Sequence, residues 1–292
     1  MEYRHIRFFL VLAEELHFTR AAARLNVAQP HLSQEIRRLE AELGVELFAR
    51  TRRHVELTEA GRIFREKARR IIDVTEEARS FVLRAGKGET GSLTIGFAGS
   101  AGYDVLPAAI RRFRARWPEV KLVLKQMHTF DQLEALRTGQ IDIGLMRRAA
   151  KKDKDLASRT IRREQLVIAL PSGHPLASKK AVAWKDLVSQ PWIVFDRTAY
   201  PGLFGDLQRA CDKAGFEPVV AQEAGEIPTM INLVASGLGA ALVPDSVTTL
   251  RRAGVVYREL RPTPSPSLLV MAWRSSSRSP TLRNFRDMIE EP

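Results

Sequence analysis

Residues 29 to 38 place amide, hydroxyl, imidazole and guanidinium groups at the spacing of one helix face. These polar residues are Gln29, His31, Ser33, Gln34, Arg37 and Arg38. An apolar stripe of Leu32, Ile36 and Leu39 lies on the opposite face. Such polar side chains match the base edges and phosphates of a DNA major groove, but the same periodicity is typical of a helical hairpin with a solvated face. The residues alone leave both interpretations open.

A basic cluster follows at Arg50-Thr51-Arg52-Arg53-His54, between two short segments of strand character. Arginine is suited to phosphates and to narrow A·T-rich minor grooves. The cluster therefore predicts the tip of a wing that contacts DNA, with Arg50, Arg52 and Arg53 as the contacting residues. A solvated basic loop is the alternative.

Two hydroxyl residues follow predicted strands in the second part of the chain. Ser100, in Gly99-Ser100-Ala101-Gly102, comes after the strand at 93–97, and Thr129 comes after the strand at 120–127. Each opens a predicted helix, whose free N–H groups and dipole favour an anion. Neighbouring parallel strands bring such points together at one sheet edge. We therefore expect Ser100 and Thr129 to hold an anionic ligand, although ordinary helix N-caps use the same residue types.

Five further residues are expected to contact the same ligand. They are Ala101, Arg147, Phe204, Ile227 and Pro228. Arg147 would supply positive charge, while Phe204 and Ile227 would cover an apolar ligand body. Residues 91–292 carry +9 of the formal charge of +12, which favours an acidic ligand. Residues 1–90 carry only +3, so net charge supports DNA binding weakly.

Catalytic chemistry is not indicated. Ala98 to Gly102 comes within one residue of the nucleophile elbow G-x-S-x-G, but the last histidine, His174, falls in a loop of a different predicted subdomain. The six histidines and Cys211 share no metal-ligand spacing, so we expect no metal or other cofactor. A serine hydrolase that uses Ser100 and a DNA-binding protein without a ligand are the two alternatives.

The composition indicates a cytoplasmic protein without a membrane span. A single cysteine excludes an internal disulfide and fits a reducing compartment. No apolar run approaches the roughly 20 residues that cross a bilayer. The early apolar run from Phe8 to Ala13 is followed at once by Glu14 and Glu15, which does not fit a signal peptide.

Three helices and a hairpin are predicted to position the first two clusters. Amphipathic spacing indicates helices over 4–15, 19–25 and 29–43, with Thr19 as the N-cap of the second. Pro30 fits the first turn of the third helix, where a missing N–H costs nothing. Two short strands fit 48–57.

A long helix is predicted from Thr58, over about 27 residues. Its apolar seam has a period near 3.5 residues, which is typical of paired helices. The seam consists of Ala60, Phe64, Ala68, Ile71, Ala78 and Val82. Glycines between 86 and 91 end the helix and mark a domain boundary.

Beyond the boundary, strands and helices alternate, which predicts parallel α/β units. Strands are expected at 93–97, 120–127, 141–145, 165–170, 192–195, 218–222, 240–243 and 267–273. Helices are expected at 103–116, 130–138, 203–214 and 227–236, and after Pro280. Two subdomains with a cleft between them are the economical arrangement.

Short motifs along the first 90 residues match one known family. They are Phe18-Thr19, Ala21-Ala22, Gln29-Pro30-His31-Leu32-Ser33-Gln34-Glu35-Ile36, Leu39-Glu40, Leu43-Gly44-Val45-Glu46-Leu47-Phe48, Arg50 and Leu57-Thr58-Glu59-Ala60-Gly61. Ile95-Gly96, Gly139-Gln140-Ile141-Asp142 and Gly237-Leu238-Gly239 extend the match to nearly the full chain. The sequence thus resembles the LysR family of bacterial regulators. Ala28 departs from the family's frequent serine and forfeits an N-cap worth about 1 kcal/mol.

The resemblance implies an N-terminal all-α winged helix-turn-helix over 1–58, a linker helix and hinge over 59–90, and an α/β effector domain over 91–292. The effector domain would resemble periplasmic binding proteins. Its subdomain I would span about 91–161 and 267–292, and its subdomain II about 162–266. Thr19, Arg20 and Pro30 would join the DNA contacts named above.

The resemblance also implies function and partners. It implies a transcription regulator, an activator or a repressor, that binds a double-stranded DNA operator and contacts RNA polymerase. Members of the family assemble as a homotetramer (a dimer of dimers) or, less often, as a dimer. The effector domain is similar to those of regulators of aromatic-compound catabolism. In those, residues matching Ser100 and Thr129 hold a carboxylate, so an aromatic or unsaturated carboxylic acid is the expected inducer.

Overall fold

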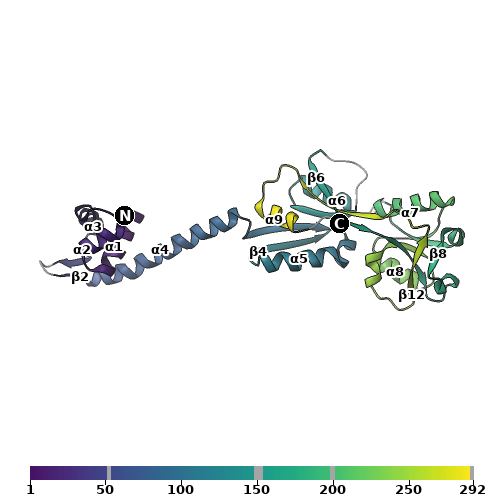
Figure 1. The fold of residues 1–292 in the computed structure, drawn as a ribbon, viewed down its shortest axis with the longest axis horizontal. Helices are drawn as coiled ribbons and strands as arrows, with labels where there is room; N and C mark the ends of the chain where they lie inside the picture. Colours follow the sequence, from purple (N-terminus) through teal and green to yellow (C-terminus); the bar gives the residue numbers. More distant parts are fainter. Residues whose placement is uncertain (51–53, 148–153, 198–200, 290–292) are drawn as a thin grey trace. The chain divides into compact units, whose positions relative to one another are not determined.

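The computed structural model describes residues 1–50, 54–147, 154–197 and 201–289. The chain divides into two compact units, Met1–Arg84 and Ala85–Pro292 (Figure 1). Each unit has its own buried core, so each is described by itself.

The first unit packs three helices around one apolar core. These are α1 (Tyr3–Glu15), α2 (Phe18–Leu25) and α3 (Gln29–Leu43), followed by the antiparallel strands β1 (Phe48–Arg50) and β2 (Val55–Leu57). The α3 stripe of Leu32, Ile36 and Leu39 is fully buried against α1, as its spacing predicted.

The residue that caps the N-terminus of α2 differs from the predicted one, whereas the N-terminus of α3 is as predicted. His17, not Thr19, is the N-cap of α2: its Nδ1 accepts a hydrogen bond from the backbone N–H of Arg20 at 3.4 Å. The prediction of Thr19 as the N-cap was wrong: α2 begins at Phe18, and the preceding His17 accepts the capping hydrogen bond on its imidazole. Ala28 precedes α3 without a side-chain cap, and Pro30 lies in the first turn.

The long helix α4 (Glu59–Gly86) begins against the hairpin. The Thr58 hydroxyl donates to the Glu46 carbonyl at 2.8 Å and accepts from the Gly61 N–H at 2.9 Å. A Cβ on Gly61 would lie 2.1 Å from the carbonyl oxygen of Leu47. Glycine at this position therefore lets α4 approach the end of the wing.

The apolar seam predicted for α4 divides into two parts. Ala60, Phe64 and Ala68 pack into the core of the first unit, which the pairing interpretation did not anticipate. Other large apolar side chains of α4 are exposed. They are Ile63, Ile71, Val74, Phe81, Val82 and Leu83.

The second unit begins with a five-stranded sheet in the order β4-β3-β5-β13-β6. Strands β3 (Gly91–Phe97), β4 (Val120–Gln126) and β5 (Ile143–Arg147) are parallel. Strands β13 (Ser267–Arg274) and β6 (Leu156–Glu164) are antiparallel to their neighbours, so the prediction of a parallel sheet holds for one half only.

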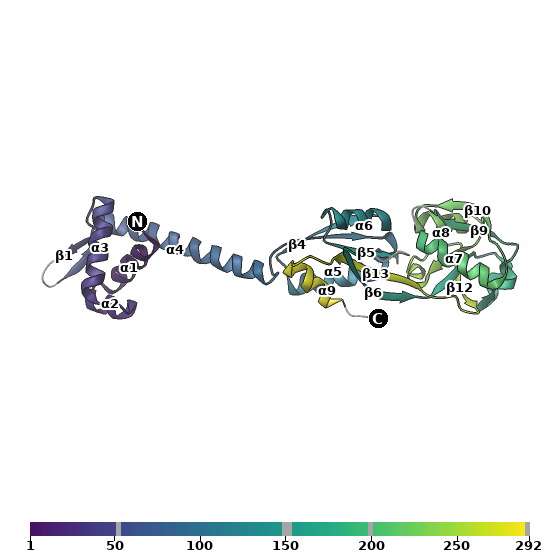
Figure 2. The ribbon, with the colours of Figure 1, turned by 90° about the horizontal axis from the view of Figure 1, so that it is seen from above.

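Helices cover both faces of this sheet (Figure 2). Helices α5 (Val105–Arg116) and α9 (Pro280–Met288) pack on one face, and α6 (Thr129–Arg137) packs on the other. A 3₁₀ helix, η1 (Gly99–Tyr103), separates β3 from α5. The carboxyl ends of β3, β4 and β5 therefore lie at one sheet edge, where η1, α6 and Arg147 begin the candidate ligand site.

The remaining strands form the second subdomain. The sheet β11-β7-β12-β8 is mixed, and the parallel pair β10-β9 joins it through a bridge between Trp192 and Ala240. Its strands are β7 (Leu166–Pro171), β8 (Ala181–Ala183), β9 (Pro191–Phe195), β10 (Val219–Ala224), β11 (Ala241–Pro244) and β12 (Val255–Arg261). Its helices are α7 (Pro201–Ala214), α8 (Ile227–Ala235), η2 (Pro175–Ser178), η3 (Trp184–Leu187) and η4 (Asp245–Thr249). Strands β6, β8 and β12 were not predicted.

Candidate DNA-binding and effector sites

The outer face of α3 presents most of the polar residues that the sequence singled out. Gln29, Pro30, Gln34, Arg37 and Arg38 are exposed. His31 and Ser33 are half-buried, and the His31 ring packs edge-on against Phe8, with centroids 6.0 Å apart. The exposed face is rich in donors, as a helix entering a major groove requires.

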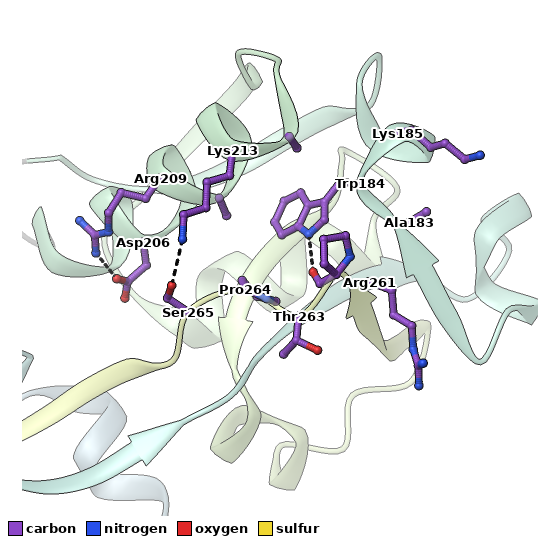
Figure 3. A pocket seen from close by; sticks show the side chains of 13 residues that line it. Ala183, Trp184, Lys185, Asp206, Arg209, Lys213, Arg261, Thr263, Pro264 and Ser265 are labelled. Atoms are coloured by element: carbon purple, nitrogen blue, oxygen red, sulfur yellow. Dashed lines mark hydrogen bonds and ion pairs between the residues drawn. The ribbon is translucent and has the colours of Figure 1, made fainter.

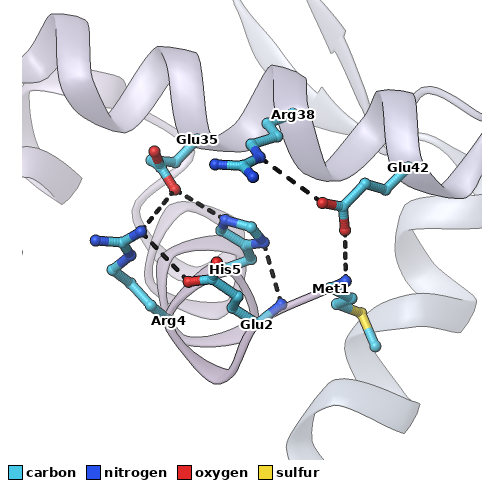
Figure 4. Close-up of polar contacts among 7 residues, drawn as sticks. All are labelled: Met1, Glu2, Arg4, His5, Glu35, Arg38 and Glu42. Carbon is cyan, nitrogen blue, oxygen red and sulfur yellow. Dashed lines mark hydrogen bonds and ion pairs between the residues drawn. The ribbon is translucent and has the colours of Figure 1, made fainter.

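Glu35 lies on the buried side of α3, and no role was predicted for it. Its Oε2 lies 2.8 Å from the Nε2 of His5, which is fully buried on α1, and 3.5 Å from an Arg4 guanidinium nitrogen (Figure 4). The backbone N–H of Glu2 donates to the other His5 ring nitrogen at 3.2 Å. This network fixes α3 on α1. The inward orientation of Glu35 could have been predicted from the sequence, because Glu35 follows Leu32 by three residues and therefore shares its buried helix face.

Arg50 is anchored within the protein. It forms an ion pair with Glu40 of α3, and its guanidinium carbon lies 5.3 Å from the centre of the Phe18 ring. The other carboxylate oxygen of Glu40 accepts hydrogen bonds from the backbone N–H groups of Leu47 and Phe48. Arg50 therefore braces the hairpin against α3. Arg52 and Arg53 lie outside the described residues.

Thr19 and Arg20 are exposed at the start of α2. The Arg20 guanidinium donates to the backbone carbonyl of Glu15 at 2.6 Å and to its carboxylate at 3.3 Å. Arg20 is thus partly held by the end of α1, whereas Gln29 and Arg37 have no recorded polar contact with the described part of the chain.

Ser100 sits in a buried polar cluster at the end of β3. The Nε of Arg147, the last residue of β5, donates to the Ser100 Oγ at 3.1 Å. Arg147 also forms an ion pair with Glu164 and donates to the Ser267 hydroxyl at 3.4 Å. All four side chains are buried. The structure thus brings Ser100 and Arg147 together, as the strand order requires.

Two details of the predicted anion site were wrong. Ser100 lies inside η1, and the α-helix that follows begins only at Val105, so no α-helix starts at the hydroxyl. The side chain of Ala101 belongs to the apolar core, and its N–H donates to the Ala98 carbonyl at 2.8 Å. Thr129 is the first residue of α6 and is buried, as expected.

The three residues expected from the second subdomain differ in placement. Phe204 is half-buried on α7, with the Arg197 guanidinium 4.7 Å from its ring centre. Ile227 is buried and packs in the second subdomain's core with Ile193 and Met230. Its position at the start of α8 suggested exposure, but the apolar face of the short helix turns inward. Pro228 is exposed.

Contacts between the subdomains adjoin this site and were missed from the sequence. The Gln126 amide, at the end of β4, donates to the Glu226 carboxylate at 3.3 Å, and a Cβ on Gly99 would lie 3.5 Å from the same carboxylate. Tyr103 of η1 packs against the second subdomain's core, and burial raises the pKa of its hydroxyl to about 12. Gln126 and Glu226 are 100 positions apart in the sequence, so no local sequence pattern could have predicted their contact.

The structure contains no catalytic arrangement around Ser100 in its described residues. His174 caps η2 through Nδ1, which accepts from the Leu176 N–H at 3.1 Å, and its Nε2 contacts Gln190. No cluster of three possible metal ligands occurs within the described ranges. None of the helices described is both long and apolar enough to cross a membrane.

Two family descriptions match the chain along nearly all of its length. Residues 3–62 match the bacterial regulatory helix-turn-helix protein, lysR family, and residues 86–291 match the LysR substrate binding domain. The chain is 40% identical to the HTH-type transcriptional regulator AlsR of Bacillus subtilis (strain 168), over 98% of this chain and 94% of that protein. It is 36% identical to the Hca operon transcriptional activator HcaR of Escherichia coli (strain K12), over 100% and 98%.

Solved structures support the same assignment over the whole fold. The crystal structure of CbnR, a LysR family transcriptional regulator, matches with a TM-score of 0.90 and 28% identity, over 99% of this chain and all of that one. Full-length CbnR complexed with its target DNA matches with a TM-score of 0.87 and 27% identity, over 99% and 98%. The chain therefore belongs to the LysR family of bacterial DNA-binding transcriptional regulators, and not to a family of enzymes.

Proposed function

We propose that this regulator is controlled by a small aromatic or unsaturated carboxylic acid, held beside Ser100, Thr129 and Arg147. Gln29, Ser33 and Arg37 on α3 read operator DNA, and the basic tip of the hairpin contacts the backbone or minor groove. The regulator works in the cytoplasm, activates an aromatic-degradation pathway together with RNA polymerase, and uses no metal or other cofactor.

The hydrogen bond from Arg147 to the Ser100 hydroxyl oxygen is the observation that carries the ligand proposal. Because Arg147 donates to the Ser100 oxygen, the hydroxyl hydrogen is left to donate to a ligand. The Nη2 of Arg147 is buried and has no hydrogen-bond partner among the described residues. Buried donors in native proteins are normally satisfied, so an acceptor oxygen fits here.

The remaining surroundings favour a compact organic acid. Thr129 adds a second hydroxyl at the start of α6, just after the neighbouring strand β4, and Phe204 of α7 is half-buried against the second subdomain's core. Glu164 already balances the charge of Arg147, so recognition rests on directed hydrogen bonds to the carboxylate more than on net charge.

Exposed apolar residues on α4 support a homodimer built on this helix, with two dimers forming a tetramer. Ile71, Val74, Ala78 and Phe81 are spaced by three and four residues, as in a helix-pairing seam. Phe81 is 53% exposed and Val74 64% exposed in the single chain, which favours a second helix as their cover. An acid that binds one arrangement of the two subdomains more tightly than the other shifts the equilibrium toward that arrangement. The size of the shift is limited to the difference between the two binding free energies.

Calorimetric titration of benzoate and of cis,cis-muconate into the full-length chain tests the ligand site. In the double variant Ser100→Ala with Thr129→Val, two hydrogen bonds to a charged group are lost, at about 1.5–3 kcal/mol each. We expect the affinity for the acid that binds to fall more than tenfold, with DNA binding retained.

The matched control replaces the same residue types at the opposite ends of β3 and α6, by Ser92→Ala with Thr138→Val. Both residues are exposed, so acid affinity should stay at the wild-type value. Wild-type affinity in the Ser100 and Thr129 double variant would show that the ligand binds elsewhere and that these hydroxyls are structural only.

A further inference from the structure

A pocket of about 340 Å³ lies in the second subdomain, between α7 and the segment that follows β12 (Figure 3). Its walls are formed by α7, by the start of η3 and by residues 261 to 265. Ser100, Thr129 and Arg147 are not among the residues that line it, so it is separate from the proposed effector site.

The lining of this pocket carries an excess of positive charge. Asp206, Arg209 and Lys213 lie on one face of α7 at spacings of three and four, and Lys185 and Arg261 lie at the rim. Asp206, the one carboxylate among the described lining residues, forms an ion pair with Arg209. The Lys213 ammonium contacts only a neutral group in the pocket, the Ser265 hydroxyl, at 3.4 Å. Its charge is available to a bound anion.

Much of the remaining lining is apolar. The Trp184 indole is 5% exposed, and its Nε1 donates to the Pro262 carbonyl at 2.9 Å. Ala210, Ala214 and Pro264 complete the apolar wall. A concave, largely apolar surface with a few directed polar groups is the usual form of a small-molecule site.

We propose that this pocket is a second binding site, for a small organic anion with an apolar body. The Lys213 ammonium and the Ser265 hydroxyl hold the anionic group, and Trp184, Ala210 and Pro264 cover the body. Figure 3 shows Lys213 and Ser265 directed toward one another across the pocket beside Trp184.

The pocket is connected to the effector site through Asp206. The Asp206 carboxylate accepts a hydrogen bond from Ser267, whose hydroxyl also accepts from Arg147, the partner of Ser100. Arg209 lines the pocket beside Lys213, so an anion held by Lys213 competes with Asp206 for the Arg209 guanidinium. The Asp206 carboxylate is then left to interact more strongly with Arg147. Occupation of the pocket thereby changes acid affinity at Ser100, and the change is reciprocal. This coupling rests on the effector site proposed above, whereas the pocket itself does not.

Fluorescence titration of the full-length chain with 8-anilinonaphthalene-1-sulfonate tests the pocket, with N-phenyl-1-naphthylamine as the same body without the anionic group. We expect the sulfonate to bind the wild type about tenfold more tightly than the neutral probe, equal to about 1.4 kcal/mol. Lys213→Met should remove this difference, Lys213→Arg should preserve it, and Lys121→Met, an equal charge change on exposed β4, should leave it intact. An unchanged difference in Lys213→Met would overturn the site.

The coupling is tested by repeating the benzoate titration with saturating sulfonate probe. We expect at least a threefold change in benzoate affinity in the wild type and none in Asp206→Asn. Equal benzoate affinity with and without the probe would overturn the coupling. Failure of benzoate to bind the wild type contradicts the effector proposal, while the Lys213 comparison still decides the pocket.

Discussion

Buried polar pairs fix the two surfaces that the proposed function uses. In the first unit, Glu35 and His5 join α3 to α1, and in the second unit Arg147 and Glu164 set the position of the Ser100 hydroxyl. Each pair is shielded from water, so loss of one partner leaves the other without its hydrogen bond.

Glu35→Ala should therefore destabilise the first unit by about 1–3 kcal/mol, because buried His5 loses its partner. Thermal unfolding of the full-length chain should show an earlier transition, together with weaker DNA binding. Glu56→Ala on the exposed side of β2 is the control and should leave both unchanged. Equal melting of the two variants would show that the pair contributes little to the position of α3.

The lone cysteine gives a second prediction at this scale. Burial raises the pKa of the Cys211 thiol to about 12, so the reactive thiolate is scarce at pH 8. A disulfide reagent such as Ellman's reagent should leave the native chain unmodified at pH 8 and titrate one thiol after denaturation. Rapid native modification would contradict the burial and would point to thiol-based sensing.

The positions of the candidate residues were largely predictable, but their partners were not. Helical spacing placed Gln29 and Arg37 on an outer face because only local periodicity was needed. The pairing of His5 with Glu35, and of Arg147 with Glu164, depends on tertiary packing that no local pattern contains. The burial of Ile227 among Ile193 and Met230 depends on tertiary packing as well.

At the scale of elements, the junction between the hairpin and α4 depends on Gly61. A methyl group there would lie 2.1 Å from the Leu47 carbonyl oxygen, a backbone atom that moves only with the hairpin. Gly61→Ala should lower the melting temperature of the full-length chain and weaken DNA binding.

Gly86→Ala, near the other end of the same helix, is the matched control for Gly61→Ala. Its new Cβ meets nothing within 4 Å, so alanine should be neutral or stabilise the helix by up to about 1 kcal/mol. If Gly61→Ala were as well tolerated as Gly86→Ala, the close approach of α4 to the hairpin would be disproved.

The exposed part of α4 gives the assembly prediction. Phe81→Asp places a charge in the proposed helix-pairing seam and should dissociate the oligomer in sedimentation velocity experiments. Val219→Asp, at a similarly exposed apolar residue on β10, should leave the sedimentation coefficient unchanged. An intact Phe81→Asp oligomer would place the subunit interface elsewhere.

Most helices and strands were predicted to within a few residues, but the short strand β8 and the strands β6 and β12 were missed. Strand β6 has the sequence Leu-Ala-Ser-Arg-Thr-Ile-Arg-Arg-Glu over 156–164, so its polar residues hide the alternation. Its antiparallel partner β13 comes more than 100 residues later in the chain. Sheet order and direction therefore could not follow from local alternation alone.

At the scale of the whole molecule, one chain combines a helix-turn-helix unit with a ligand-binding α/β unit. The family assignment joins these units in one regulator, and the proposed function adds control of the first by acid bound to the second. Motif spacing sufficed to predict the family, because its signature residues are local in sequence. The exact inducer could not be predicted in the same way, because the proposed site combines Ser100 of η1, Thr129 of α6 and Arg147 of β5, which are far apart in sequence, with residues of a second subdomain.

In the proposed function, acid bound at Ser100 and Thr129 alters how α3 engages DNA. The most direct test is a quantitative DNase I footprint titration on a fragment that the full-length chain selects from a random library, with and without the acid that binds in calorimetry. We predict that the acid changes the footprint or its midpoint in the wild type, and that the Ser100→Ala, Thr129→Val variant keeps the acid-free footprint throughout. Identical wild-type footprints with and without bound acid would contradict the account.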